Sequence, residues 1–181
     1  VEAMDRAKSS GKALHLLGLL SDGGVHSHIE HLFALLNMAK QRGLEKVYIH
    51  AFLDGRDVPP QCAGQYIDAL ENKIAEIGIG KIASIGGRYF GMDRDKRWER
   101  VQVAYDAFTM GDDPKGSVKY LLADSASEAL EAAYSRDETD EFVTPTFIRG
   151  AIPVRDGDSI IMFNFRPDRA REITRSFVDE E

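Results

Sequence analysis

The stretch HLLGLLSDGGVHSH, residues 15–28, decides the fold class of this chain. Its first six residues form a short apolar run typical of a buried strand, and the double glycine after Asp22 lets the backbone turn tightly. A helical pattern follows over residues 29–42, where apolar residues recur at helical spacing. Strand, glycine-rich turn and amphipathic helix together form the repeating unit of a parallel α/β sheet.

The same unit recurs twice along the chain. Residues 47–53 form the second predicted strand, followed by a helix from about Pro59 to Ile77. Residues 81–85 form the third, followed by a helix over residues 95–109. We therefore predict an α/β fold: an open, mostly parallel sheet with helices on both faces, in a three-layer sandwich.

The next part of the chain is less regular. Residues 110–124 are rich in glycine and aspartate, which predicts a loop. A helix is predicted over residues 127–135, with Ser125 or Ser127 as its N-cap.

Two further strands are predicted near the C-terminus. Residues 141–148 predict a short strand at an edge of the sheet, because Pro145 has no N–H to donate. Residues 160–163 predict a core strand, and Pro167 suits the first turn of a last helix. No linker separates these segments, so residues 1–181 are predicted to be one domain.

Composition limits the kinds of partner. The 181 residues carry 23 Lys and Arg against 30 Asp and Glu, for a formal net charge of −7. Nucleic acids and anionic membranes reward a basic surface, so we expect neither as a partner. The lone Cys62 excludes an internal disulfide, and the absence of a long apolar run predicts a cytoplasmic protein. Because the chain begins at Val1 and ends on acidic residues, we expect a piece of a longer protein.

Arginines cluster where the predicted strands end, against the acidic balance of the whole chain. Arg56 follows the second strand, Arg88 and Arg94 follow the third, and Arg166 and Arg169 follow the strand near the C-terminus. Open α/β sheets bind their ligands just beyond the carboxyl ends of the strands. The planar guanidinium holds a carboxylate or phosphate by paired hydrogen bonds. We therefore predict a pocket for a small, multiply anionic ligand.

The segment after the first strand, SDGGVHSH, supplies two histidines one residue apart. Alternate residues of an extended segment point the same way, so His26 can place its imidazole on a substrate oxygen. A rival interpretation takes His26 and His28, with Asp22 or His31, as metal ligands. We favour a functional His26 and structural roles for His28 and His31.

The motif DGRD follows the second strand. Arg56 beside Asp57 would ordinarily be a salt bridge within a turn, but it coincides with the other strand-end arginines, which favours a role in the site. An aspartate beside an arginine is expected to be ionised and able to accept a proton. Asp57 is therefore our candidate general acid/base.

The remaining cations divide into two groups. Arg88 and Arg94 are the better ligand candidates of GGRYFGMDRDKRW, whereas Lys96, Arg97 and Arg100 are expected to belong to a solvated, charged helix start. In FNFRPDRA, Arg166 and Arg169 lie three residues apart, a spacing that places both on one face at a helix start. There they could clamp a phosphate together with the helix amides, with Asp168 in support.

Four motifs, LLSDGGVHSH, HAFLDGRD, GGRYFGMDRDKRW and FNFRPDRA, in this order and spacing, resemble the cofactor-independent (2,3-bisphosphoglycerate-independent) phosphoglycerate mutase family. The resemblance covers the whole chain but only one of the family's two domains. That domain is the substrate-binding, or phosphotransferase, domain, inserted within a phosphatase-like domain. The resemblance implies that residues 1–181 are this domain, excised and shortened at the C-terminal end.

The resemblance also implies a reaction, the glycolytic interconversion of 3-phosphoglycerate and 2-phosphoglycerate through a phosphoserine intermediate. The family's nucleophilic serine and two manganese ions lie in the phosphatase-like domain, so no metal is expected in this fragment, which alone should be inactive. The implied partners are the two phosphoglycerates and the phosphatase-like domain, in a monomeric parent. Asp57 matches the residue thought to exchange protons with the glycerate hydroxyls. The substrate-binding residues carried over are His26, Arg56, Asp57, Arg88, Arg94, Arg166 and Arg169.

Two other functions remain open. A metal-dependent hydrolase built on the H-x-H segment would need further strand-end ligands, whereas His15 and His50 lie in mid-strand. A non-catalytic receptor for phosphorylated ligands would use the same arginines.

Overall fold

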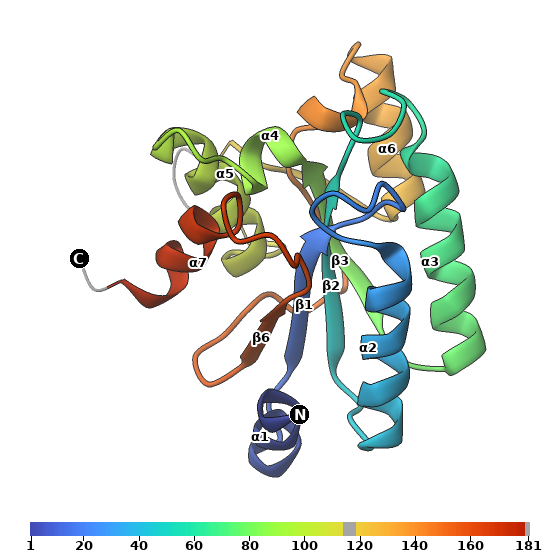
Figure 1. Cartoon of the computed structure of the whole chain (residues 1–181), viewed down its shortest axis with the longest axis vertical. Coiled ribbons are helices and arrows are strands. Elements are labelled where there is room, and N and C mark those ends of the chain that lie inside the picture. The colour runs from blue at the N-terminus through green and yellow to red at the C-terminus, as the bar shows by residue number, and fades with distance from the viewer. Residues whose placement is uncertain (114–118, 180–181) are drawn as a thin grey trace.

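The computed structural model describes residues 1–113 and 119–179, and six strands among them form one sheet (Figure 1). The strands are β1 (Leu14–Leu19), β2 (Val47–Leu53), β3 (Lys81–Gly87), β4 (Leu121–Ala123), β5 (Thr146–Ile148) and β6 (Ser159–Met162). Their order across the sheet is β4-β5-β3-β2-β1-β6. All neighbours pair in parallel except β3 and β5, which pair antiparallel. The predicted mostly parallel sheet is confirmed.

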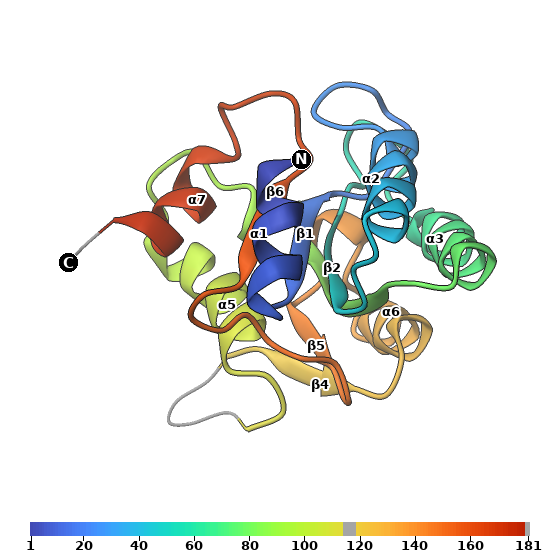
Figure 2. The ribbon, with the colours of Figure 1, turned by 90° about the horizontal axis from the view of Figure 1, so that it is seen from below.

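Helices cover both faces of this sheet, as the view along the strands in Figure 2 shows. The seven α-helices of the described residues are α1 (Glu2–Ser10), α2 (Ile29–Gln41), α3 (Ala63–Ile77), α4 (Arg88–Gly91), α5 (Trp98–Thr109), α6 (Ala126–Ser135) and α7 (Arg171–Val178). On one face α2, α3 and α6 pack side by side, while α5 and α7 pack on the other. The three-layer sandwich is therefore confirmed.

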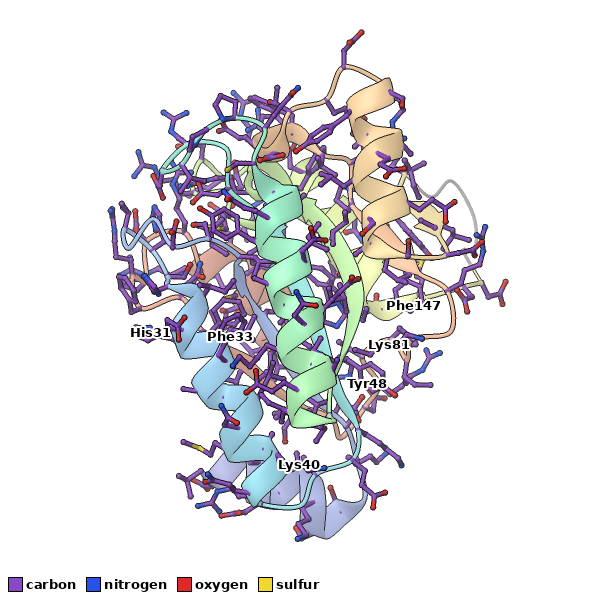
Figure 3. All side chains as sticks on the ribbon, turned by 90° about the vertical axis from the view of Figure 1, so that its right-hand side faces the viewer. His31, Phe33, Lys40, Tyr48, Lys81 and Phe147 are labelled. Atoms are coloured by element: carbon purple, nitrogen blue, oxygen red, sulfur yellow. The ribbon has the colours of Figure 1, made fainter. Side chains whose placement is uncertain are left out.

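The central strands β1 and β2 are mostly apolar because each face lies under helices, although each strand also buries one histidine, His15 and His50. In β1, Leu14 and Leu16 enter the core beneath α2 and α3, whereas Leu17 and Leu19 enter the core beneath α5 and α7. Burying one such side chain contributes about 1.5–3 kcal/mol. Figure 3 looks onto the α2–α3 layer, where Phe33 of α2 lies beneath the ammonium group of Lys73 from α3. A continuous apolar run is the pattern expected of parallel strands covered on both faces.

The positions of two strands differ from the predictions. β5 is not at an edge, because β4, within a segment predicted to be a loop, pairs along its outer side. Pro145 lies just before β5, where its carbonyl oxygen accepts from Leu121 N–H and no N–H of its own is needed. Conversely, β6 is no central strand: among the described residues it pairs only with β1, and Ile160 and Ile161 are half-buried.

Helix boundaries also differ in two places near the predicted arginines. A short helix, α4, begins directly at Arg88, so the third strand and the following helix are separated by an extra turn. The last helix begins at Arg171, which leaves Pro167 outside its first turn. Arg166 and Arg169 therefore lie in the segment before α7, and the predicted placement at a helix start is wrong. Ser125 caps α6 by accepting from Glu128 N–H, as predicted.

Among residues 1–113 and 119–179, no helix has both the length and the hydropathy needed to cross a membrane.

Candidate functional site: an arginine-lined pocket

The carboxyl ends of β1, β2, β3 and β6 meet at one edge of the sheet, toward the top of Figure 1. A cavity of about 300 Å³ lies at this edge, and four of the predicted arginines line it: Arg56, Arg88, Arg94 and Arg169. A larger groove of about 640 Å³ between α5 and α7 contains none of the predicted site residues. The pocket at the strand ends is therefore the candidate functional site.

Asp54, the first residue after β2, organises the buried side of the pocket. Its Oδ2 accepts from Ser21 Oγ at 2.6 Å, and its Oδ1 accepts from the Asp57 N–H at 2.9 Å and from Arg88 Nη1 at 2.8 Å. Burial alone would raise the pKa of Asp54, but these hydrogen bonds together lower it below its ordinary value. Asp54 thus joins the turns after three strands through one carboxylate.

Arg88 and Asp57 form the second buried contact. Arg88 Nη1 donates to Asp57 Oδ2 at 2.8 Å while it also binds Asp54. Arg88 can reach both carboxylates because α4 begins directly at the end of β3 and turns its first residue inward. Among the residues that the structure describes, none donates to Asp57 Oδ1, which leaves that oxygen available to a ligand.

The segment around the 3-10 helix Asp140–Phe142 closes one side of the pocket. Gly87 N–H donates to the Val143 carbonyl, and a Cβ on Gly87 would lie 2.0 Å from the Glu141 carbonyl oxygen, so only glycine fits there. Arg56 reaches the same segment, with its Nη1 3.4 Å from Glu141 Oε1. The end of β3 is therefore fixed against this segment, and the turn after β2 contacts it through Arg56.

His26 does not line the cavity but lies near charged groups of both its buried and its exposed side. It is buried, its carbonyl accepts from Phe165 N–H, and its Nδ1 lies 3.8 Å from Asp168 Oδ1. Within the described residues, Nδ1 has no hydrogen-bond partner. Burial, and then the nearby Arg88 and Arg166, lower the pKa of His26. A neutral ring with an unpaired nitrogen is suited to bind a ligand oxygen.

Asp168 forms hydrogen bonds with two exposed arginines, Arg94 and Arg166. Its Oδ2 accepts from Arg94 Nη1 at 3.3 Å and from Arg166 Nη2 at 3.1 Å. Burial would raise the pKa of Asp168, but the hydrogen bonds and charge of Arg166 lower it. Arg169 turns the other way and donates to the Met92 carbonyl at 3.2 Å, so Arg166 and Arg169 do not act as one clamp.

The structure separates the two histidines of the H-x-H segment. His28 Nδ1 accepts from Glu30 N–H and caps α2, and His31 is exposed with its ring edge-on to Phe165. In the described part of the chain, no three His, Cys, Asp or Glu side chains lie close enough to hold a metal ion together. The described residues therefore do not fit a metal centre.

Several residues at the pocket were not predicted from the sequence, among them Asp54 and Arg100. Asp54 stands in the same motif as Arg56 and Asp57, but nothing in the motif alone distinguishes it from an ordinary turn aspartate. Arg100, predicted to be solvated, instead lines the pocket, pairs with Asp93 at 3.4 Å and lies over the Tyr89 ring at 3.8 Å. The sequence signal that could have placed Arg100 at the pocket was its position on the first turn of α5.

Residues 1–181 match the protein family described as the BPG-independent PGAM N-terminus. The chain belongs to this family. It is 56% identical over 185 residues to a 2,3-bisphosphoglycerate-independent phosphoglycerate mutase of Clostridium perfringens, covering 100% of this chain and 35% of that protein. To the protein of the same name in Symbiobacterium thermophilum it is 58% identical over 174 residues, covering 96% and 32%.

A solved structure shows the same fold. A crystal structure of Leishmania mexicana phosphoglycerate mutase at low cobalt concentration superposes with a TM-score of 0.89 and 35% sequence identity. The match covers 99% of this chain and 34% of that one. The chain thus spans about a third of the length of the relatives it matches.

Proposed function

We propose that this chain is the substrate-binding part of a mutase that interconverts 3-phosphoglycerate and 2-phosphoglycerate. The observation that carries the proposal is the pocket at the strand ends, which is lined by Arg56, Arg88, Arg94 and Arg169 and in which Arg88 pairs with Asp54 and Asp57. A phosphoglycerate offers a carboxylate, a phosphate and a hydroxyl. Guanidinium groups suit the first two, and a carboxylate suits the proton of the third.

Asp57 is proposed as the general acid/base. Arg88 fixes one of its oxygens, so the carboxylate is oriented before the ligand arrives, and the other oxygen can exchange a proton with a glycerate hydroxyl. Its neighbour Asp54 would hold Arg88 and the Asp57 backbone in place without touching the substrate. A proton exchanged at Asp57 lets either hydroxyl become the phosphoryl acceptor.

The exposed arginines are proposed to bind the anionic groups. Arg56 pairs with Glu141, and Arg94 and Arg166 with Asp168, in contacts of 3.1–3.4 Å that a ligand oxygen could replace at little cost. His26, with its unpaired Nδ1, would complete the contact with the ligand.

The phosphoryl group itself needs an acceptor elsewhere. By the family resemblance, a serine in a phosphatase-like domain would accept the phosphoryl group, and two manganese ions held there would supply Lewis-acid chemistry. The described residues of this chain do not fit such a metal centre. This chain's task would be to retain the glycerate while it reorients and to exclude water, so that transfer outcompetes hydrolysis. Such an enzyme would work in the cytoplasm.

The proposal is tested by titrating the chain with 3-phosphoglycerate, glycerate and inorganic phosphate in a calorimeter. We expect weak binding that is tightest for 3-phosphoglycerate, and no mutase turnover by a metal-free preparation. Equal affinity for phosphate alone, or turnover without metal, would contradict it.

A second experiment separates the mutase from a receptor for phosphorylated ligands. In a longer protein that carries this segment, Asp57→Asn should lower kcat far more than it raises the substrate Kd. A receptor would have no turnover to lose.

A further inference from the structure

Two segments that carry predicted ligand arginines are joined to each other at the pocket. The loop of residues 92–97 carries Arg94, and the segment before α7 carries Arg166 and Arg169. Three contacts join them: Asp168 Oδ2 with Arg94 Nη1 at 3.3 Å, the Met92 carbonyl with Arg169 Nη1 at 3.2 Å, and Glu172 Oε1 with Lys96 N–H at 2.9 Å. Of these three contacts, only the one between Glu172 and Lys96 N–H involves a buried carboxylic acid.

Glu172, in the first turn of α7, lies beside a second buried acid, Asp93. Glu172 is 7% exposed and Asp93 4%. Asp93 Oδ2 accepts from Asp95 N–H at 3.0 Å and Arg97 N–H at 2.9 Å, and Oδ1 faces Arg100 at 3.4 Å. Glu172 Oε2, by contrast, is buried and has no partner among the described residues when both carboxyls are ionised. A single proton on Glu172 would turn this oxygen into a donor toward Asp93.

We propose that Glu172 is a positioning residue of the arginine pocket: its protonated carboxyl donates from Oε2 to Asp93 and accepts at Oε1 from Lys96 N–H, and so fixes the loop that carries Arg94. The inference rests on the proposed function, in which Arg94 binds the ligand. It extends that function to a residue that does not touch the ligand.

The electrostatics around Glu172 agree with a proton on this residue. Burial, and then the hydrogen bond and charge of Asp93 and the charge of Asp95, raise the pKa of Glu172. For Asp93, burial opposes ionisation, but the hydrogen bonds from Arg97 N–H, Glu172 and Asp95 N–H lower its pKa. One acid of the pair is thus suited to donate and the other to accept.

The loop backbone also needs external support. Lys96 has a φ of 58°, in the left-handed region that a side chain other than glycine rarely adopts. The hydrogen bond from its N–H to Glu172 holds this conformation in place. Without it, the loop would relax and Arg94 would lose its position beside Arg166.

The test compares Glu172→Gln and Glu172→Ala, with Glu99→Gln on the exposed first turn of α5 as the matched control. Glutamine can donate to Asp93 and accept from Lys96 N–H, so it should keep the wild-type protection of the Lys96 amide in hydrogen exchange and the wild-type Kd for 3-phosphoglycerate. Alanine should lose the protection and weaken binding about tenfold. A glutamine variant as impaired as alanine, or an alanine variant that matches the control, would overturn the proposal.

A pH series keeps the test decisive if the alanine variant does not fold. In the wild type, the Lys96 protection factor should fall as pH rises through the raised pKa of Glu172, because ionised Glu172 would then face ionised Asp93. In Glu172→Gln it should not depend on pH over the same range, and equal pH dependence in both would refute the shared proton. If the wild type shows the protection but binds no phosphoglycerate, the proposed function fails while the positioning contact stands.

Discussion

The two sides of the arginine pocket differ in how their charges are held. Arg88 has a side chain only 3% exposed and binds two carboxylates, those of Asp54 and Asp57. The side chains of Arg56, Arg94 and Arg166 are 63%, 50% and 46% exposed. The buried side is fixed when the chain folds, because an unpaired buried charge is costly.

The exposed side has weaker contacts that can be exchanged. Solvent-exposed ion pairs contribute about 0–1 kcal/mol, so Glu141 and Asp168 can release their arginines to a ligand. The difference suggests a division of roles, in which buried charges set the geometry of the acid/base and exposed charges supply affinity.

The largest effect is expected from breaking the buried pair. Asp54→Asn leaves Arg88 with one carboxylate instead of two and should lower the free energy of unfolding by about 3 kcal/mol. The matched change Asp168→Asn, at the exposed carboxylate, should cost less than about 1 kcal/mol. Urea unfolding of both variants measures this, and similar losses would abolish the distinction between the two sides.

A steric change on the buried side should come next. A Cβ on Gly87 would lie 2.0 Å from a backbone oxygen, so Gly87→Ala should cost about 1–3 kcal/mol as an overpacked contact. Gly24→Ala is the control, since its Cβ would have no neighbour nearer than 3.9 Å and would cost only the strain of a φ of 70°, about 1 kcal/mol. Equal stabilities of the two variants in thermal unfolding would argue against the close approach at Gly87.

The two sides were also not equally predictable from the sequence. The apolar runs at residues 15–20 and 47–53 and the turns after them carry local signals, and parallel strands place their carboxyl ends together, so the exposed arginines could be predicted to converge. Asp54 could not, because its role depends on Ser21 and Arg88, which lie 33 and 34 residues away. The role of Glu172 could not be predicted either, because its hydrogen-bond partner Lys96 lies 76 residues away in the sequence.

Short strands with distant partners explain the errors in the fold. β4 and β5 have three residues each, too few for any periodicity to appear. Their place in the sheet is set by the antiparallel pairing of β5 with β3, which no local pattern encodes. Pro167 misled the prediction because proline suits a turn before a helix as well as its first turn.

A smaller effect is expected from removing an exposed arginine. Arg94→Ala should weaken binding of 3-phosphoglycerate by about tenfold, or about 1.4 kcal/mol, and leave the unfolding free energy within about 0.5 kcal/mol. Arg149→Ala is the matched control, because Arg149 is equally exposed and pairs with Asp124 away from the pocket. If calorimetry finds the same loss of affinity in both, the effect is one of overall charge and the pocket has no special part in it.

The smallest effect concerns His26, where the two sides meet. Arg166 lowers its pKa and Asp168 raises it, so Arg166→Gln should move the pKa of His26 up and Asp168→Asn should move it down. Because burial already holds this pKa below 6.5, protonation of His26 favours the unfolded chain, and stability should fall as pH drops below about 6.5. NMR titration of the His26 ring, assigned with His26→Asn, measures both shifts. If neither variant moves the pKa of His26, the exposed charges do not reach His26 and the two sides act independently.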